Sequence, residues 1–130
     1  MNNKAKFLQR NVPCYLYEED LIKEHCHALL NTMPGVDFLY SIKTNPFMPV
    51  LKTVAAQSFG ADAASANEVL MAHEAGIPCD KIYYSAPGKT LQDLEKVWGK
   101  CTIIADSLSE LARLEQCAEV KNECISIGVR

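Results

Sequence analysis

The sequence lacks a long apolar run and an excess of basic residues. A helix that spans a bilayer needs about 20 consecutive apolar residues, and no stretch of this chain approaches that length, so we expect no membrane span. The first residues, Met1 to Lys6, carry charge with no apolar stretch behind them, which predicts no secretory signal. The formal net charge of -3 offers no basic patch and argues against a nucleic-acid partner.

Closely spaced cysteine pairs are also missing. The chain has six cysteines, and no two of them form a CxxC pair: Cys14, Cys26, Cys79, Cys101, Cys117 and Cys124. Several fall inside predicted strands or helices, where a reduced cysteine behaves as a small hydrophobe. We therefore expect reduced thiols in a cytoplasmic protein, without disulfides or a zinc site. The three histidines form no metal-binding pattern.

What the sequence does contain is a regular alternation of strand-like and helix-like segments. The predicted strands are 12–17, 36–43, 61–65, 81–86, 101–106 and 124–130. The predicted helices are 18–33, a helix that opens at Pro46 or Pro49 and runs to 58, 66–75, 90–99 and 108–120. This alternation predicts a parallel sheet covered by helices.

Two architectures accommodate that pattern. A doubly wound open sheet can close within 130 residues, whereas a complete (β/α)₈ barrel needs roughly 250. Length alone favours the open sheet. Three features favour the barrel instead. The chain stops inside a predicted strand, with no helix to complete that unit. The first predicted strand is followed by a helix that leads into the regular strand–helix units, so this strand need not belong to the same sheet. Polar residues also end the strands, which both folds use for functional groups: Lys43, Ser65, Ser85, Asp106 and Arg130.

Lys43 is the first candidate for chemistry. In the strand that ends at Lys43, alternation places Leu39, Ser41 and Lys43 on one face. If the other face packs on helices, Lys43 points inward, where desolvation lowers the pKa of an amine and makes it a usable nucleophile. The alternative is a lysine that has merely reached the exposed end of its strand. In the last strand, the small residues beside Arg130 leave room for a ligand, and the arginine could meet an anion.

Several segments together resemble one family. The stretch 40–46, Tyr-Ser-Ile-Lys-Thr-Asn-Pro, is similar to the lysine motif of fold-type III pyridoxal-phosphate (PLP) decarboxylases, the ornithine/diaminopimelate/arginine decarboxylase family. Further segments resemble the same family in its order and spacing: 13–17, 60–68, 81–90, 103–107 and 127–130. The resemblance covers nearly the whole chain.

The resemblance implies a fold and a set of site residues. The fold is a partial TIM-like (β/α) barrel, with residues 1–130 forming roughly the first four to five βα units with parallel strands. Lys43 takes the place of the lysine that holds PLP as an internal aldimine. Asp62 and Glu68 match acidic positions near the cofactor, and Arg130 matches an arginine at the end of a barrel strand. Glu68 has an alternative role, because Ser65-Ala-Asn-Glu68 also reads as a capping box.

The implied function is the N-terminal part of a PLP-dependent decarboxylase that acts on a basic or diamino acid, of the diaminopimelate or ornithine kind. The complete family enzyme is a homodimer. Its C-terminal β domain, its ring-stacking histidine, its Gly-rich phosphate loop and the acid that pairs with the pyridine nitrogen are expected outside residues 1–130. We therefore expect this chain alone to be inactive. The alternatives are a PLP-binding racemase or a non-catalytic carrier, or a small open-sheet binding domain in which Lys43 is structural.

Overall fold

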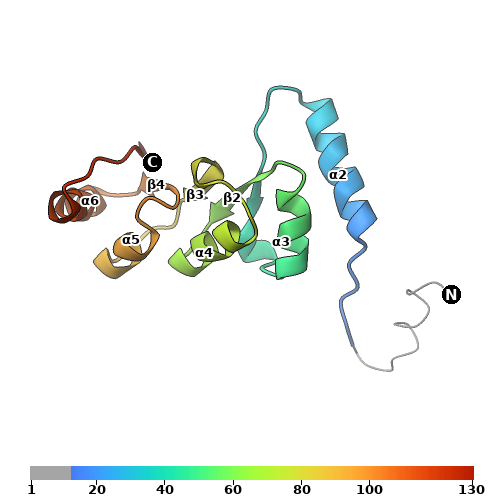
Figure 1. Cartoon of the computed structure of the whole chain (residues 1–130), viewed down its shortest axis with the longest axis horizontal. Coiled ribbons are helices and arrows are strands. Elements are labelled where there is room, and N and C mark those ends of the chain that lie inside the picture. The colour runs from blue at the N-terminus through green and yellow to red at the C-terminus, as the bar shows by residue number, and fades with distance from the viewer. Residues whose placement is uncertain (1–12) are drawn as a thin grey trace.

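The computed structural model describes residues 13–130, which form one sheet of five parallel strands alternating with helices (Figure 1). The strands are β1 (Leu39–Ser41), β2 (Gly60–Ala63), β3 (Ile82–Tyr84), β4 (Thr102–Ala105) and β5 (Ile127–Val129). The helices are α2 (Glu19–Thr32), α3 (Met48–Ala55), α4 (Ala66–Glu74), α5 (Leu91–Val97) and α6 (Leu108–Lys121). The chain also has two 3-10 turns: η1 (Ile42–Thr44) directly follows β1, and η2 (Cys79–Lys81) directly precedes β3.

The order of the strands distinguishes the two architectures. Each strand pairs in parallel with the strand that precedes it in the chain, so the order across the sheet is β1-β2-β3-β4-β5. A doubly wound sheet reverses direction at a switch point and carries helices on both faces. Here the units follow one another from α2 to α6 without reversal (Figure 1). The predicted partial barrel is confirmed, and the open-sheet alternative is wrong.

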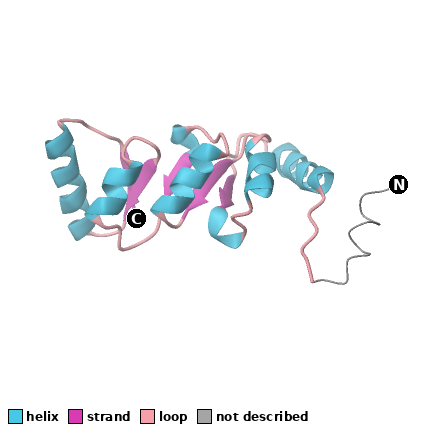
Figure 2. Cartoon of the chain, turned by 60° about the horizontal axis from the view of Figure 1, so that its bottom comes forward, coloured by secondary structure: helices cyan, strands magenta, loops and turns pink. Residues whose placement is uncertain are grey.

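The main core lies between one face of the sheet and the helices α3 to α6, and Figure 2 shows these helices against the strands. The sheet and the turn η1 contribute side chains with at most 4% exposure: Ile42 from η1, and Ala61, Ala63, Ile82, Tyr84, Ile103 and Ala105 from the strands. The helices contribute Leu51, Val69, Leu94, Val97 and Leu114, among others. A smaller cluster, with Cys26, Val50, Val54 and Phe59 at its centre, joins α2 to α3.

The opposite face of the sheet carries a different set of side chains. Strand register places Ser41 beside Asp62, and Asp62 beside Tyr83. Side chains at such positions are only partly buried, in contrast to the helix-covered face. In a closed barrel the helices lie outside, so this second face is the one that corresponds to the barrel interior.

Side-chain caps explain where three of the helices begin. The hydroxyl of Ser65 accepts a hydrogen bond from Glu68 N (3.2 Å), that of Thr90 from Asp93 N (3.1 Å), and that of Ser107 from Glu110 N (3.2 Å). Each bond satisfies an N–H group that the first turn of a helix leaves without a partner. The caps therefore start α4, α5 and α6 directly after the turns that follow β2, β3 and β4.

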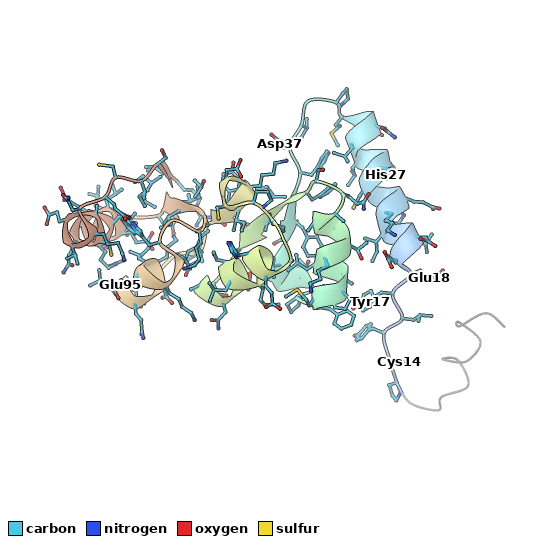
Figure 3. All side chains as sticks on the ribbon, in the orientation of Figure 1. Cys14, Tyr17, Glu18, His27, Asp37 and Glu95 are labelled. Atoms are coloured by element: carbon cyan, nitrogen blue, oxygen red, sulfur yellow. The ribbon has the colours of Figure 1, made fainter. Side chains whose placement is uncertain are left out.

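The first predicted strand does not form in the structure, and the others that do form are shorter than predicted. Residues 13–17 of the predicted strand 12–17 are extended but pair with no strand in the described part of the chain, and Val12 lies outside it. Instead, the ring of Tyr17 packs against Phe47, with centroids 5.7 Å apart, at the foot of α2 beside α3 (Figure 3). The strand predicted over 36–43 is also shorter, because β1 ends at Ser41 and η1 follows.

Candidate functional site

The carboxyl ends of the five strands meet at one edge of the sheet. This edge carries polar side chains from successive strands or from the residues that follow them: Ser41, Lys43, Asp62, Ser85, Asp106 and Arg130. Because parallel strands present these ends together, functional groups in βα barrels gather there. The edge is therefore the candidate site.

Asp62 is the best-held side chain at this edge. It lies in β2 on the face opposite the helices, and its two carboxylate oxygens have different partners. Ser41 Oγ donates to Asp62 Oδ2 at 3.2 Å, and Ser85 Oγ donates to Asp62 Oδ1 at 2.5 Å. Hydrogen bonds to an ionised carboxylate are stronger than those between neutral groups. Three neighbouring strands thus fix the orientation of one carboxylate in the middle of the site.

Lys43 lies in η1, two residues past the end of β1, so it is at the carboxyl end of the strand but not within it as predicted. The turn closes with a hydrogen bond from Asn45 N to Ile42 O (3.0 Å), and Thr44 Oγ1 donates to Ser41 O (2.7 Å). Ile42 is completely buried and anchors the turn against the core, whereas Lys43 is exposed. The expected desolvation of its amine is therefore absent from this structure.

The Lys43 amine is nevertheless different from that of the other lysine that follows a strand at this edge. Among the described residues, the Lys43 side chain makes no hydrogen bond or ion pair. Lys89, in the loop after β3, is completely buried, and its Nζ atom donates to Ala86 O, Ile104 O and Glu110 Oε2. An amine with three donors can make three such bonds, so Lys89 has none to spare. Lys43 is the lysine at this edge that a ligand can reach.

Arg130 and Asp106 form a second pair at the site. Arg130 Nε donates to Asp106 Oδ1 at 2.7 Å, and Arg130 N donates to Ala105 O, which continues the pairing of β5 with β4. The Arg130 side chain is 58% exposed and that of Asp106 is 19% exposed. Much of the guanidinium therefore remains available to an anion.

Glu68 acts as a cap in this structure. Its Oε2 atom accepts a hydrogen bond from Ala64 N at 2.8 Å, while its own N–H donates to Ser65 Oγ. The capping interpretation of this residue is confirmed, with Ala64 N in place of the Ser65 N–H that a strict capping box uses. A role near a cofactor stays a prediction.

The structure brings the predicted site residues together only in part. Asp62 contacts Ser41 and Ser85, and Arg130 contacts Asp106, but within the described residues no hydrogen bond joins these two groups to each other or to Lys43. Sequence reasoning did not find the buried pair of Lys89 and Glu110. The two residues are 21 positions apart, and nothing in the segment around either one reveals the other as its partner.

Metal-binding clusters and membrane-spanning helices are both absent from residues 13–130. No group of three or more His, Cys, Asp or Glu side chains in that range is arranged to hold a metal ion. No helix in the same range is long and apolar enough to cross a membrane.

Comparison with known proteins places this edge in a wider context. Residues 19–130 match the family described as "Pyridoxal-dependent decarboxylase, pyridoxal binding domain". The chain is 35% identical to L-glutamyl-[BtrI acyl-carrier protein] decarboxylase of Niallia circulans over 91% of its length, and that match covers 28% of the relative. It is 31% identical to the diaminopimelate decarboxylase of Campylobacter jejuni over its full length, covering 33% of that enzyme.

Solved structures have the same arrangement. Diaminopimelate decarboxylase from Helicobacter pylori complexed with L-lysine superposes with a TM-score of 0.87 at 28% identity, covering 99% of this chain and 34% of the other. Lysine/ornithine decarboxylase from Vibrio vulnificus complexed with cadaverine gives a TM-score of 0.79 at 25% identity, covering 98% of this chain and 34% of the other. The chain thus spans about a third of the length of the proteins it matches.

Proposed function

Because this chain belongs to the pyridoxal-dependent decarboxylase family, whose pyridoxal-binding domain it matches over residues 19–130, we propose that Lys43 is the residue that binds PLP. In this proposal the chain supplies four βα units and a fifth strand of the barrel of an amino-acid decarboxylase. The observation that carries it is the exposed amine of Lys43 at the carboxyl end of β1, beside a strand edge where Lys89 is fully engaged. A lysine must have a free amine to bond to an aldehyde cofactor.

The residues around Lys43 fit a cofactor of this kind. The turn η1 packs against β2 and α4, so Lys43 is anchored next to the strand that carries Asp62. The two serine hydroxyls keep the Asp62 carboxylate fixed, and the exposed guanidinium of Arg130 can meet a phosphate or carboxylate group. When bound, PLP supplies an electron sink for the bond that breaks at the amino-acid substrate.

The remaining contacts of the cofactor are proposed to come from sequence that corresponds to the other two thirds of the matched proteins. These contacts are a phosphate loop, a ring-stacking histidine and an acid for the pyridine nitrogen. The complete enzyme is proposed to act as a homodimer. The work of this chain is then to hold the cofactor through Lys43 and to present fixed charges at Asp62 and Arg130.

The proposed substrate is a basic or diamino acid of the diaminopimelate or ornithine kind. The structure matched from H. pylori holds L-lysine, and the one from V. vulnificus holds cadaverine. The identity of 35% to a decarboxylase of a carrier-bound glutamyl group supports a second candidate, an aminoacyl group on a carrier protein. A racemase or a non-catalytic PLP carrier uses the same lysine and stays open.

Trapping with PLP tests the role of Lys43 directly. The chain is mixed with less than one equivalent of PLP, reduced with borohydride and digested, and the modified lysine is identified by peptide mass spectrometry. We expect Lys43 to carry most of the label. Lys52, which is exposed on α3, serves as the matched control, and Lys52→Ala should leave the labelling of Lys43 unchanged. Labelling spread evenly over the exposed lysines would contradict the assignment.

A chimera tests the reaction and its substrate. Residues 1–130 replace the matched third of the H. pylori enzyme, and CO₂ release is measured with diaminopimelate, ornithine, lysine, arginine and a carrier-bound glutamyl group. We expect release from a diamino acid, and we expect Lys43→Ala to abolish kcat rather than to raise KM alone. Activity that survives in Lys43→Ala would exclude this lysine. Racemisation without CO₂ release would favour the racemase alternative.

A further inference from the structure

Lys89 and Glu110 form an ion pair that is shielded from solvent. Their Nζ and Oε2 atoms lie 3.1 Å apart, and the side chains are 0% and 1% exposed. Lys89 Nζ also donates to Ala86 O and, at 2.7 Å, to Ile104 O, and it lies 5.1 Å from the centroid of the Tyr84 ring. The lysine therefore joins its own loop to strand β4.

Glu110 extends this linkage to the turn after β4. Its Oε1 atom accepts from Lys89 N at 3.0 Å, and its Oε2 atom accepts from Asp106 N at 2.9 Å. Burial alone would raise the pKa of the Glu110 carboxyl, but hydrogen bonds from the Asp106 and Lys89 N–H groups and from the Lys89 amine lower the pKa below its usual value. The lowered pKa favours the carboxylate form of Glu110, and both buried side chains are hydrogen-bonded, as buried charged groups must be.

The cap of α4 provides an internal comparison. Glu68 accepts from Ala64 N at 2.8 Å and donates through its own N–H to Ser65 Oγ at 3.2 Å. Glu110 repeats this geometry with Asp106 and Ser107, at 2.9 Å and 3.2 Å. Within the described residues, no lysine or arginine binds Glu68. A glutamate therefore begins such a helix without a buried lysine, and capping does not account for Lys89.

The hydrogen-bond partners of Lys89 and Glu110 lie next to residues of the candidate site. Ala86 directly follows Ser85, whose hydroxyl holds Asp62, and Asp106 holds Arg130. We propose that Lys89 and Glu110 are positioning residues, which fix the loop after β3 against the turn after β4 and thereby set the places of Ser85 and Asp106 at the site. They touch neither substrate nor cofactor. The importance of that site for catalysis rests on the proposed function, but the positioning itself does not.

Stability alone would not require an ion pair here. Replacing a buried ion pair by apolar side chains of similar volume is often neutral for stability, whereas removing one partner leaves a buried charge alone. The double variant Lys89→Met with Glu110→Met therefore separates the two roles, because it removes both charges and keeps the volume. A purely structural pair would leave the site unchanged in this variant.

NMR on the chain follows the removed contact at the Asp106 amide, and it gives two readouts, at Arg130 and Asp62, that a purely structural pair would not move. In the double variant we expect the Asp106 amide to lose roughly tenfold or more of its protection against hydrogen exchange, since its acceptor is gone. We expect the Arg130 Nε–H signal and the Asp62 carboxyl carbon signal to shift as well, although neither residue contacts the substituted side chains. Glu68→Gln is the matched control, and it should leave the Asp106 and Arg130 signals as in the parent.

Unchanged Arg130 and Asp62 signals in a folded double variant would overturn the positioning role. If the double variant fails to fold, Glu110→Gln replaces it, because the amide keeps the shape and one acceptor oxygen; the same shifts, smaller in size, are expected, and their absence overturns the proposal equally. PLP trapping on the parent chain keeps the two proposals apart. If Lys43 is not labelled while the NMR shifts occur, the proposed function fails and the positioning role stands.

Discussion

Gly60 and Gly128 offer a matched test of how closely neighbouring strands approach. A Cβ on Gly60, at the start of β2, would collide with the backbone oxygen of Lys81 and lie 2.6 Å from Leu39 Cδ2. The oxygen belongs to the turn η2 and has no rotamer to change, so β2 and η2 would have to separate. A Cβ on Gly128 would meet only the side chain of Ile104, which can rotate away.

The two costs follow from this difference. Overpacking a well-packed site costs about 1–3 kcal/mol, and replacing glycine by alanine returns about 0.4–1 kcal/mol through the unfolded state. Gly60→Ala should therefore lower the free energy of unfolding by up to about 2.5 kcal/mol, with the upper part of this range expected because the colliding atom is backbone, and Gly128→Ala should change it by less than about 0.5 kcal/mol. At this chain length, 1 kcal/mol corresponds to a shift in Tm of roughly 3–6 °C.

Urea denaturation followed by circular dichroism measures both variants against the parent. Gly60 lies at the amino end of its strand, away from the candidate site, so PLP labelling of Lys43 should survive in folded Gly60→Ala. Equal stabilities for the two variants, or a greater loss in Gly128→Ala, would refute the packing argument.

Three further outcomes are expected. Asp62→Ala should cost about 1–3 kcal/mol, because two serine hydroxyls lose a charged acceptor, whereas Asp62→Asn keeps an acceptor and should cost less; thermal denaturation compares them. The pKa of Glu110 is lowered from 4.5 in the folded state, so its stabilising contribution is present above that pH and is lost as pH falls through the folded value; Glu110→Gln should flatten the acid limb of a stability–pH profile. The isolated chain should bind PLP weakly and release no CO₂, because the other contacts of the cofactor are proposed to come from outside residues 1–130. It should also self-associate, because β5 presents an exposed apolar edge beside a groove of about 510 Å³ against α6. Light scattering that shows a stable monomer would contradict the self-association.

Much of the fold could be predicted because its signals are local. The hydroxyls of Ser65 and Ser107 lie three residues before a glutamate, and each helix begins where that pattern places it. The turn at Ile42 to Thr44 was missed because apolar alternation continues through it, while the hydrogen bond that closes the turn depends on Asn45. The alternation therefore predicted a strand that the backbone does not follow.

The site could be predicted as a set of positions but not as a set of contacts. Lys43, Asp62 and Arg130 were found from strand ends and from the family resemblance. The partners of Asp62 come from strands 21 and 23 residues away, and such pairs depend on strand register, which no single segment encodes. The buried Lys89 was missed for the same reason, since a lysine in a Gly-Lys-Thr loop gives no sign that it will lie inside the protein.

The strictly sequential strand order also has a consequence for how the chain folds. Each strand pairs with a neighbour only about twenty residues away in the chain, so each pairing closes a loop of similar, modest entropy. No pairing has to wait for the two ends of the chain to meet, so the entropy cost of forming the sheet is divided among similar steps. During synthesis, each new strand can pair with the strand made before it, so the sheet can grow from β1 toward β5 as the chain leaves the ribosome. A substitution that disrupts β2 would then slow the pairing of every later strand, whereas a substitution that disrupts β5 would leave β1 to β4 paired.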